Sequence, residues 1–402
     1  MLFHTYYSCA IMNIEKIRED FPILEKDIVY FDNACMTLRP KQVIEKMNEY
    51  YYEYPACAGR SSHKLALKTE DEYNKSRHSI AKHINAKENE IIFTRNTTEG
   101  LNLVANSLKI DKKKTVLTTD REHNSNLVVW QLLKKKEVEH KIFYTGNDFD
   151  LEKFKIAVKN IKLVSFVHTS NLDGYTLPVK EIIKIAHDAG SLVMLDAAQS
   201  MPHKQIDVKK LDVDFLAFSG HKMLGPSIGC LFGKEHLLKD LEPFIVGGDT
   251  VQSTTYKDHV FLDPPEKFEA GLQNYAGAIG LAEAVRYLDK IGKDNIEKNE
   301  LKINKFITQE LEKMDFVKIL GPSVEKRSSL ISFNVDKINF HDIALMFNDM
   351  KNIMIRSGQH CVHSWFDANN LKGSARASFY LYNTIEEASM FVETLNKIAR
   401  LR

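Results

Sequence analysis

The chain has 402 residues, 44% of them hydrophobic, and its 55 basic and 54 acidic residues leave a formal net charge of +1. A chain of this length can bury a large core and is longer than one usual domain, so two domains are expected. The balanced charge gives no electrostatic basis for binding nucleic acid or an anionic membrane surface, and no apolar run is long enough to span a bilayer.

The five cysteines, at positions 9, 35, 57, 230 and 361, are odd in number and scattered, with no CxxC pair. This distribution argues against a disulfide framework and against a zinc site. The expected compartment is therefore a reducing cytoplasm. Residues 1–11 lack the basic region of a signal peptide, and we interpret them as an N-terminal extension upstream of a start at Met12 or as a small ordered arm.

The first segment that indicates chemistry is a strand followed by a helix start. Residues 90–94 are typical of a strand, and the helix after them begins near Asn96, a credible N-cap. Free backbone amides at the helix start, together with the hydroxyls of Thr97 and Thr98, suit a phosphate group. Taken alone, the same residues are more often an ordinary capped helix.

A βαβ unit is expected next. Residues 161–167 are typical of a buried strand, residues 178–189 of an amphipathic helix closed by Gly190, and residues 191–195 of the following strand. Asp196 then falls at the carboxyl end of a parallel strand, where open α/β sheets bind their ligands. A carboxylate in this place can pair with the protonated pyridine nitrogen of a cofactor.

The most informative residue is Lys222, at the end of the run Ala217-Phe218-Ser219-Gly220-His221-Lys222. An apolar strand that ends in Ser-x-His-Lys places the lysine amine beside small hydrogen-bonding residues, which suits a carbonyl cofactor held as a Schiff base. Most other lysines are expected on solvated faces. Paired with Asp196, Lys222 predicts a cofactor ring that acts as an electron sink.

A domain boundary is expected near residues 289–294, where Ile291-Gly292-Lys293-Asp294 interrupts a helical pattern. A long helix over residues 295–313 should follow. The strand at residues 330–335 and the segment at residues 342–350 then indicate a smaller α/β unit.

Several segments, in one order along the chain, resemble the class V, fold-type I family of pyridoxal phosphate enzymes, and most closely the SufS-type group II cysteine desulfurases. The matching segments are residues 30–34, 93–99, 122–123, 196–199, 219–222 with Gly225-Pro226, 356–361 and 376–383. The resemblance implies a large cofactor-binding domain over residues 31–290, with a mainly parallel seven-stranded sheet sandwiched by helices. It also implies a smaller α/β domain made of residues 12–30 and 291–402.

The same resemblance implies roles for the matching residues. The cofactor-binding set is Thr97, Thr98, His123, Asp196, Gln199, Ser219, His221 and Lys222, with Gln199 on the ring hydroxyl and the threonines, Ser219 and His221 on the phosphate. His123 is expected to stack on the ring and to serve in proton transfers. The substrate-binding set is Asn171, Arg356 and Arg376, with Arg60 and His63 near the entrance of the site.

Cys361 is the expected nucleophile. A cysteine is by default a small buried hydrophobe, and that interpretation suits Cys230 within the apolar run at residues 228–232. Cys361 instead lies between His360 and His363, in surroundings typical of a reactive cysteine. Its short distance in sequence from Arg376 resembles the group II arrangement, in which the nucleophile sits on a short, ordered loop.

Together with these residues, the resemblance implies a homodimeric cysteine desulfurase, which converts L-cysteine to L-alanine and carries the sulfur on Cys361 as a persulfide. The sulfur would pass to an acceptor or scaffold protein for iron–sulfur cluster or other thio-cofactor assembly. A selenocysteine lyase would carry nearly the same residues. A class V aminotransferase or a C–S lyase would need Lys222 but no thiol at position 361, and a non-catalytic sulfur carrier or scaffold fits poorly with an intact cofactor pocket.

The chain departs from the family pattern at four places, one of which is residues 56–63, which stand where the family more commonly has His-Arg-Gly near the entrance of the site. Gly271-Leu272 stands where the family has Gly-Thr, whose threonine reaches the phosphate of the neighbouring subunit's cofactor, and leucine cannot donate that hydrogen bond. Asn124 follows His123 in place of a second histidine. Val362 follows Cys361, and the loop lacks the proline that stiffens it in the family.

Overall fold

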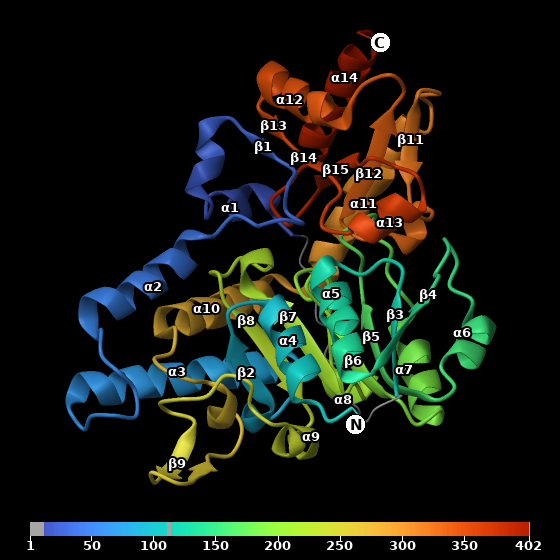
Figure 1. The fold of residues 1–402 in the computed structure, drawn as a ribbon. Helices are drawn as coiled ribbons and strands as arrows, with labels where there is room; N and C mark the ends of the chain where they lie inside the picture. The colour runs from blue at the N-terminus through green and yellow to red at the C-terminus, as the bar shows by residue number, and fades with distance from the viewer. Residues whose placement is uncertain (1–11, 111–113, 402) are drawn as a thin grey trace, which may run out of the picture.

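A computed structural model describes residues 12–110 and 114–401. Residues 1–11, for which an extension or arm is expected, lie outside the described residues. Figure 1 shows two units, each built on its own sheet, with the smaller one stacked above the larger one. None of the helices in the described part of the chain has the length and apolarity that a bilayer crossing needs.

The larger unit is built on a seven-stranded sheet with the order β2-β8-β7-β6-β5-β3-β4. Its strands are β2 (Ile91–Thr94), β3 (Thr115–Thr119), β4 (Glu139–Phe143), β5 (Ile161–Val167), β6 (Leu192–Asp196), β7 (Phe215–Ser219) and β8 (Gly229–Gly233). Strand β8 runs antiparallel to both neighbours, and the other adjacent pairs are parallel. The predicted fold class, with a mainly parallel seven-stranded sheet, is confirmed.

Helices cover both faces of this sheet because its inner strands are apolar on both faces. In β7, Phe215 and Ala217 join a core with helices on one face, and Leu216 and Phe218 join a core on the other. The helices of this unit are α2 (Lys41–Glu53), α3 (Lys64–His83), α4 (Thr97–Ser107), α5 (Asn124–Leu132), α6 (Leu151–Ala157), α7 (Val179–Asp188), α8 (Val208–Leu211), α9 (Glu235–Asp240) and α10 (Tyr275–Ile291). Helices α4 and α5 pack on the first face, and α3, α7 and α10 on the second.

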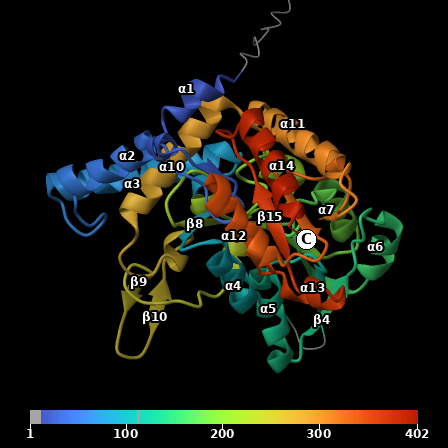
Figure 2. The ribbon, with the colours of Figure 1, turned by 90° about the horizontal axis from the view of Figure 1, so that it is seen from above.

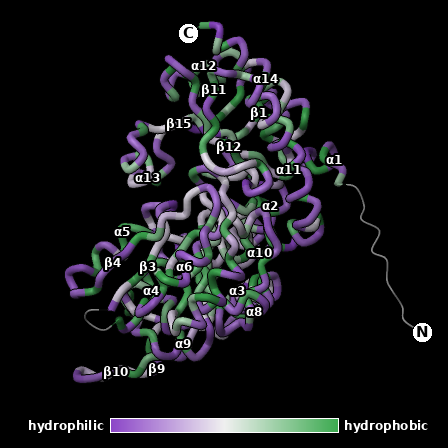
Figure 3. Tube along the Cα trace, turned by 90° about the vertical axis from the view of Figure 1, so that its right-hand side faces the viewer, coloured by the Kyte–Doolittle hydropathy of each residue, from purple (hydrophilic) through white to green (hydrophobic). Residues whose placement is uncertain are grey.

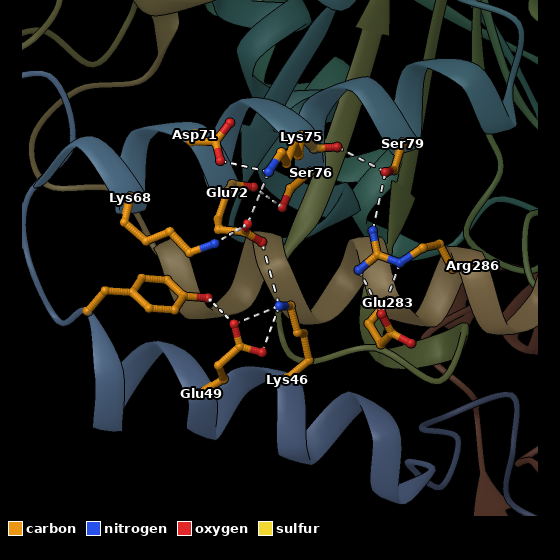
Figure 4. A network of polar contacts seen from close by, with 11 residues as sticks. Lys46, Glu49, Lys68, Asp71, Glu72, Lys75, Ser76, Ser79, Glu283 and Arg286 are labelled. Atoms are coloured by element: carbon orange, nitrogen blue, oxygen red, sulfur yellow. Dashed lines mark hydrogen bonds and ion pairs between the residues drawn. The ribbon is translucent and has the colours of Figure 1, made fainter. Parts of the chain in front are cut away.

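Helices α2, α3 and α10 form a layer at one side of the larger unit, where Figure 2 shows them next to one another. Figure 4 shows the polar contacts that connect them. Lys46 of α2 pairs with Glu72 of α3 at 3.6 Å, and Arg286 of α10 donates a hydrogen bond to Ser79 of α3 at 3.4 Å. The hairpin of β9 (Val251–Thr254) and β10 (His259–Phe261) projects nearby, and Figure 3 shows its tip as hydrophilic.

The smaller unit is an antiparallel sheet with the order β11-β12-β15-β14. Its strands are β11 (Val317–Leu320), β12 (Leu330–Val335), β14 (Arg356–Gly358) and β15 (Ser374–Ser378), and its helices are α11 (Lys293–Leu311), α12 (Phe340–Lys351), α13 (His363–Ala368) and α14 (Ile385–Ala399). The core between sheet and helices includes Phe347 stacked on Phe391, with ring centroids 4.6 Å apart. This apolar core is separate from the two cores of the larger unit.

The N-terminal segment lies against the smaller unit. Strand β1 (Val29–Tyr30) pairs in parallel with β13 (Ile353–Met354). Arg18, at the end of α1 (Ile14–Arg18), donates hydrogen bonds to the Tyr382 carbonyl oxygen and to Glu387, each at 2.7 Å. These contacts hold the N-terminal segment against the smaller unit. The segment that follows β1 then passes between the two units.

Candidate active site

A cavity of about 200 Å³ lies where residues of both units meet. Side chains from the carboxyl ends of β6 and β7 line it together with residues of β14, β15 and the loop before α13. Of the predicted site residues, the cavity is lined by Thr97, Thr98, His123, Asn171, Asp196, Gln199, Ser219, His221, Lys222, Arg356, Cys361 and Arg376. Residues predicted from separate stretches of sequence therefore meet at one place.

Arg60 and His63 do not line this cavity. Arg60 is exposed and forms an ion pair with Asp249, with its Nε atom 3.0 Å from a carboxylate oxygen. His63 is the N-cap of α3 and accepts a hydrogen bond from the Ala66 amide. Both side chains are engaged in these local contacts, and their place near the entrance of the site stays a prediction.

Lys222 and Asp196 occupy the deep end of the cavity. Strand β6 ends at Asp196, and a single turn after β7 carries Lys222, so the neighbouring strands β6 and β7 deliver both side chains. Lys222 is half-buried, and its side chain lines the cavity. Burial lowers the pKa of Lys222, and nearby Asp196 opposes this shift. Burial raises the pKa of Asp196, against the hydrogen bond from the Ala198 amide and the charge of Lys222.

The start of α4 supplies hydroxyl groups at another side of the cavity. The Thr97 and Ser219 hydroxyls are 2.6 Å apart, and the Thr98 hydroxyl lies 2.7 Å from that of Ser125. Asn96 caps the helix by accepting from the Glu99 amide at 3.0 Å. The backbone here is closely packed: a Cβ atom at Gly229 would lie 2.5 Å from the Asn96 Cα atom, so position 229 requires glycine.

His123 enters the cavity from the start of α5. Its Nδ1 atom accepts a hydrogen bond from the Ser125 amide at 3.1 Å. Burial, followed by the positive charge of Lys222, lowers the pKa of His123 to about 3. The ring is therefore neutral near pH 7, and because Nδ1 accepts, its proton is on Nε2.

Arg376 lies on the cavity wall with unused hydrogen-bonding capacity. Its Nη1 atom donates to the Asn171 carbonyl oxygen at 2.8 Å, and its Nη2 atom lies 3.4 Å from an Asp32 oxygen. The buried Nε of Arg376 and the buried side-chain oxygen Oδ1 of Asn171 have no hydrogen-bond partner in the described part of the chain. Buried polar atoms are normally satisfied, so an unfilled donor at a cavity wall points to an anionic ligand.

The loop that carries Cys361 is held in an uncommon backbone conformation. His360 and Cys361 have φ angles of 50° and 59°, the left-handed region that side-chain-bearing residues seldom adopt. The Asn124 amide donates to the Cys361 carbonyl oxygen at 2.7 Å, and the Asn171 side chain donates to the His360 carbonyl oxygen at 2.6 Å. The larger unit thus fixes the loop of the smaller unit so that the cysteine lines the cavity.

Some lining residues were not predicted from the sequence, including Cys35, Ser125 and His360. Cys35 directly follows one segment that matches the family, and His360 lies within another. The matching segments could therefore have indicated both residues. Ser125 follows the matched Glu122-His123 pair by two residues. Its place in the site depends on the turn at the start of α5 and has no separate sequence signal.

The donor set fits pyridoxal phosphate. The helix start and its hydroxyls suit the phosphate group, and the buried carboxylate of Asp196 suits a protonated pyridine nitrogen. Gln199 lines the same cavity, donates to the Ala34 carbonyl oxygen at 2.6 Å and keeps its side-chain oxygen for other contacts. Lys222 would carry the cofactor, and the neutral imidazole of His123 would lie against the ring.

Comparison with known proteins agrees with this site. The profile of the aminotransferase class-V family matches residues 29–391. A probable cysteine desulfurase of Pyrococcus abyssi is 41% identical over 394 residues, which cover 96% of this chain and 98% of the relative. The apo structure of a cysteine desulfurase from Thermococcus onnurineus superimposes with a TM-score of 0.94 at 38% identity, covering 96% of this chain and 98% of that one. A cysteine desulfurase structure from Escherichia coli gives 0.89 at 28% identity, covering 97% and 99%.

Proposed function

The chain belongs to the aminotransferase class-V family, and on that premise we propose that it is a pyridoxal phosphate-dependent cysteine desulfurase. It would convert L-cysteine to L-alanine and take the sulfur onto Cys361 as a persulfide. The observation that carries this proposal is the presence of a thiol, a deeply placed lysine and two arginines around one small cavity. A transaminase or C–S lyase has no use for the thiol.

Substrate binding is assigned to the arginines and Asn171. The substrate carboxylate would bind Arg376, whose buried Nε has no partner among the described residues. Asn171 lies beside Arg376, because its backbone carbonyl oxygen accepts a hydrogen bond from the Arg376 guanidinium. Charge-assisted hydrogen bonds of this kind are strong in a buried site. Arg356 would add a second positive charge beside the same group.

Lys222 is assigned the proton transfers at the α-carbon. When bound, pyridoxal phosphate supplies an electron sink for the α-carbon of the amino acid. Burial lowers the pKa of Lys222, and a lysine with a lowered pKa can accept a proton once its amine is free. His123, neutral with its proton on Nε2, would pack against the ring and donate from that atom.

Cys361 is assigned the sulfur transfer. Its thiolate would attack the sulfur of the bound cysteine, so that a bond forms between the two sulfur atoms and the bond between that sulfur and the β-carbon breaks. The fixed loop conformation holds the nucleophile at the cavity and avoids an entropic cost of ordering at the moment of attack.

The test is incubation of the purified protein with L-cysteine, L-selenocysteine and common amino-donor pairs, followed by analysis of alanine and of the mass of the peptide that contains Cys361. We expect alanine from cysteine and one added sulfur atom on Cys361. The Cys361→Ser variant should lose both, while Cys57→Ser, which alters a cysteine outside the cavity lining, should behave as wild type. Native sulfide release by Cys361→Ser would instead identify a C–S lyase.

Two copies of the chain would associate through the side that carries α2, α3 and the β9–β10 hairpin. Large hydrophobic side chains are exposed there, which is typical of an interaction surface. They are Ile44, Tyr51, Tyr52, Leu67, Val246, Tyr256 and Val260. Leu272 is 64% exposed near this side, so a leucine, which offers no hydroxyl group, would face the neighbouring subunit.

The remaining assignments complete the proposal. The domains would be residues 31–290, and residues 12–30 with 291–402, in line with the separate cores and with the break at Gly292 between α10 and α11. The enzyme would act in the cytoplasm, since the four cysteines within the described residues are free thiols. The persulfide sulfur would be delivered to an acceptor or scaffold protein for iron–sulfur cluster or thio-cofactor assembly.

A further inference from the structure

A second thiol lies in the same cavity as Cys361. Cys35 follows Ala34 in the segment between β1 and α2, and both Cys35 and Cys361 line the cavity. The segment is well fixed: the Ala34 amide donates to the Ser378 hydroxyl at 2.9 Å, and the Cys35 amide donates to the Asp32 carbonyl oxygen at 3.1 Å. The place of Cys35 in the cavity is therefore set by the fold.

Cys35 does not have the surroundings of a structural cysteine. Cys230, in β8, is completely buried among apolar side chains, and burial raises its pKa. Cys35 is only partly buried, and the Nη1 atom of Arg356 donates a hydrogen bond to its sulfur at 2.9 Å. Arginine beside a partly accessible sulfur is the environment of a nucleophilic cysteine, whereas inert cysteines are buried in apolar surroundings.

Independent features mark the same wall as a place for an anionic group. Arg376, whose buried Nε has no hydrogen-bond partner within residues 12–110 and 114–401, pairs in register with Arg356 across strands β14 and β15. Arg356 in turn contacts Cys35. A thiol from each of two separate segments lines this cavity of about 200 Å³, and both thiols lie within electrostatic reach of Lys222.

We propose that Cys35 is a second sulfur-carrying residue, which receives the outer sulfur atom of the Cys361 persulfide inside the active-site cavity. The Cys35 thiolate attacks that outer sulfur, and a bond forms between it and the Cys35 sulfur. The bond between the outer sulfur and the Cys361 sulfur breaks, and its electron pair stays on Cys361 as a thiolate. The proton on the outer sulfur moves with it, so the exchange needs no oxidant, reductant or further reactant.

This inference rests on the proposed desulfurase function and extends it. Transfer to Cys35 returns Cys361 to its thiolate form, so that one chain can accept a second sulfur atom before any acceptor arrives. A chain that used Cys361 alone would hold a single added sulfur. The stoichiometry of bound sulfur therefore distinguishes the two arrangements.

The test is brief incubation of the holoenzyme with excess L-cysteine, followed by alkylation, digestion and mass analysis of each cysteine peptide. We expect added sulfur on Cys35 and on Cys361, approaching two sulfur atoms per chain. In Cys361→Ala no sulfur should appear on Cys35, and in Cys35→Ser, which keeps a polar partner for Arg356, the total should fall to one. The matched control Cys57→Ser should retain two. Sulfur on Cys361 with an unmodified Cys35 would overturn the inference while leaving the desulfurase function intact.

A measurement that needs no catalysis separates failure of the inference from failure of the function. Treatment of the substrate-free protein with diamide should link the two thiols if their sulfur atoms can meet, since a disulfide forms only between closely placed cysteines. We expect a Cys35–Cys361 cross-linked peptide. If Cys35 and Cys361 both remain free thiols under conditions that oxidise Cys57, the inference is wrong, whether or not the protein forms alanine from cysteine.

Discussion

Arg356 and Arg376 lie directly opposite each other in the register of strands β14 and β15, and both side chains line one cavity. Like charges directly opposite each other in a sheet are destabilising. The carboxylate that Arg376 contacts among the described residues is Asp32, at 3.4 Å. The pair is therefore arranged for an anion that arrives from outside the chain, such as the carboxylate of an amino acid.

Replacement of Arg376 by lysine should weaken cysteine binding. Lysine keeps the charge but cannot reproduce the planar array of donors that a guanidinium offers to a carboxylate. We expect KM for L-cysteine to rise about tenfold to a hundredfold, in keeping with a charge-assisted hydrogen bond of roughly 1.5–3 kcal/mol. Arg286→Lys, in the surface pair with Glu283, is the control and should leave KM unchanged. An unchanged KM for the Arg376 variant would remove the residue from substrate binding.

Replacement of Lys222 by alanine should remove the visible absorbance that pyridoxal phosphate acquires when a protein amine holds it. The reason is that Lys222 is the lysine among the described residues that lines the cavity, and it follows β7, the strand beside the one that ends at Asp196. Absorbance spectra of the purified variant with added cofactor provide the measurement. Lys75→Ala, at an exposed pair with Asp71, should keep the band. A band that persists without Lys222 would mean that another lysine carries the cofactor.

Acid should destabilise the protein partly through His168. Burial lowers the pKa of His168 from 6.5 to about 3 in the folded chain. Between these values the unfolded state binds a proton that the folded state does not, so the free energy of unfolding falls as pH drops below 6.5, by up to about 1.4 kcal/mol per pH unit. Urea unfolding at pH 7, 6 and 5 should give a shallower pH dependence for His168→Gln. An identical dependence would show that His168 does not contribute.

Gly229→Ala should disturb the hydroxyl-bearing end of the cavity. Gly229 lies in register between Thr94 and Ser219, and its added Cβ atom would meet the Asn96 backbone at 2.5 Å. We expect a loss of about 1–3 kcal/mol in the free energy of unfolding and weaker cofactor binding, because the start of α4 must shift. Thermal unfolding and cofactor titration would measure both effects. An unchanged free energy of unfolding and unchanged cofactor binding would mean that the start of α4 shifts without an energetic cost.

A charge on the exposed aromatic surface should weaken association of two copies. Tyr52 of α2 is 83% exposed, and Tyr52→Glu would place a carboxylate within the proposed interface. Sedimentation should show more monomer for this variant than for wild type. Leu345→Glu, at a hydrophobic residue of α12 that is 61% exposed outside this surface, is the matched control and should leave the distribution unchanged. Equal effects of the two substitutions would argue against an interface at α2.

The strands, and the site residues at the ends of those strands, could be predicted from the sequence because their signals are local. Both segments are short and rich in apolar residues, and the predicted strands at residues 161–167 and 330–335 coincide with β5 and β12. The predicted helix start after residue 294 is slightly late: α11 begins at Lys293, directly after Gly292, whose φ of 86° ends the preceding helix. Asp196 lies at the end of β6, as predicted.

Other parts of the site depend on contacts that no local pattern encodes. The left-handed backbone at His360 is held by Asn171, which is 189 residues away in sequence. The contact between Cys35 and Arg356 spans 321 residues. Arg60 pairs with Asp249, a partner 189 residues away that only the tertiary fold brings close.

The two carbonyl groups at the tip of the thiol-bearing loop are both anchored by donors from the opposite unit. To carry sulfur out of the cavity, the loop would have to break both of these hydrogen bonds and leave its left-handed backbone conformation. Under the proposed function, sulfur delivery would therefore depend on access: the acceptor would have to insert a narrow segment into the cavity, while Cys361 stays in place.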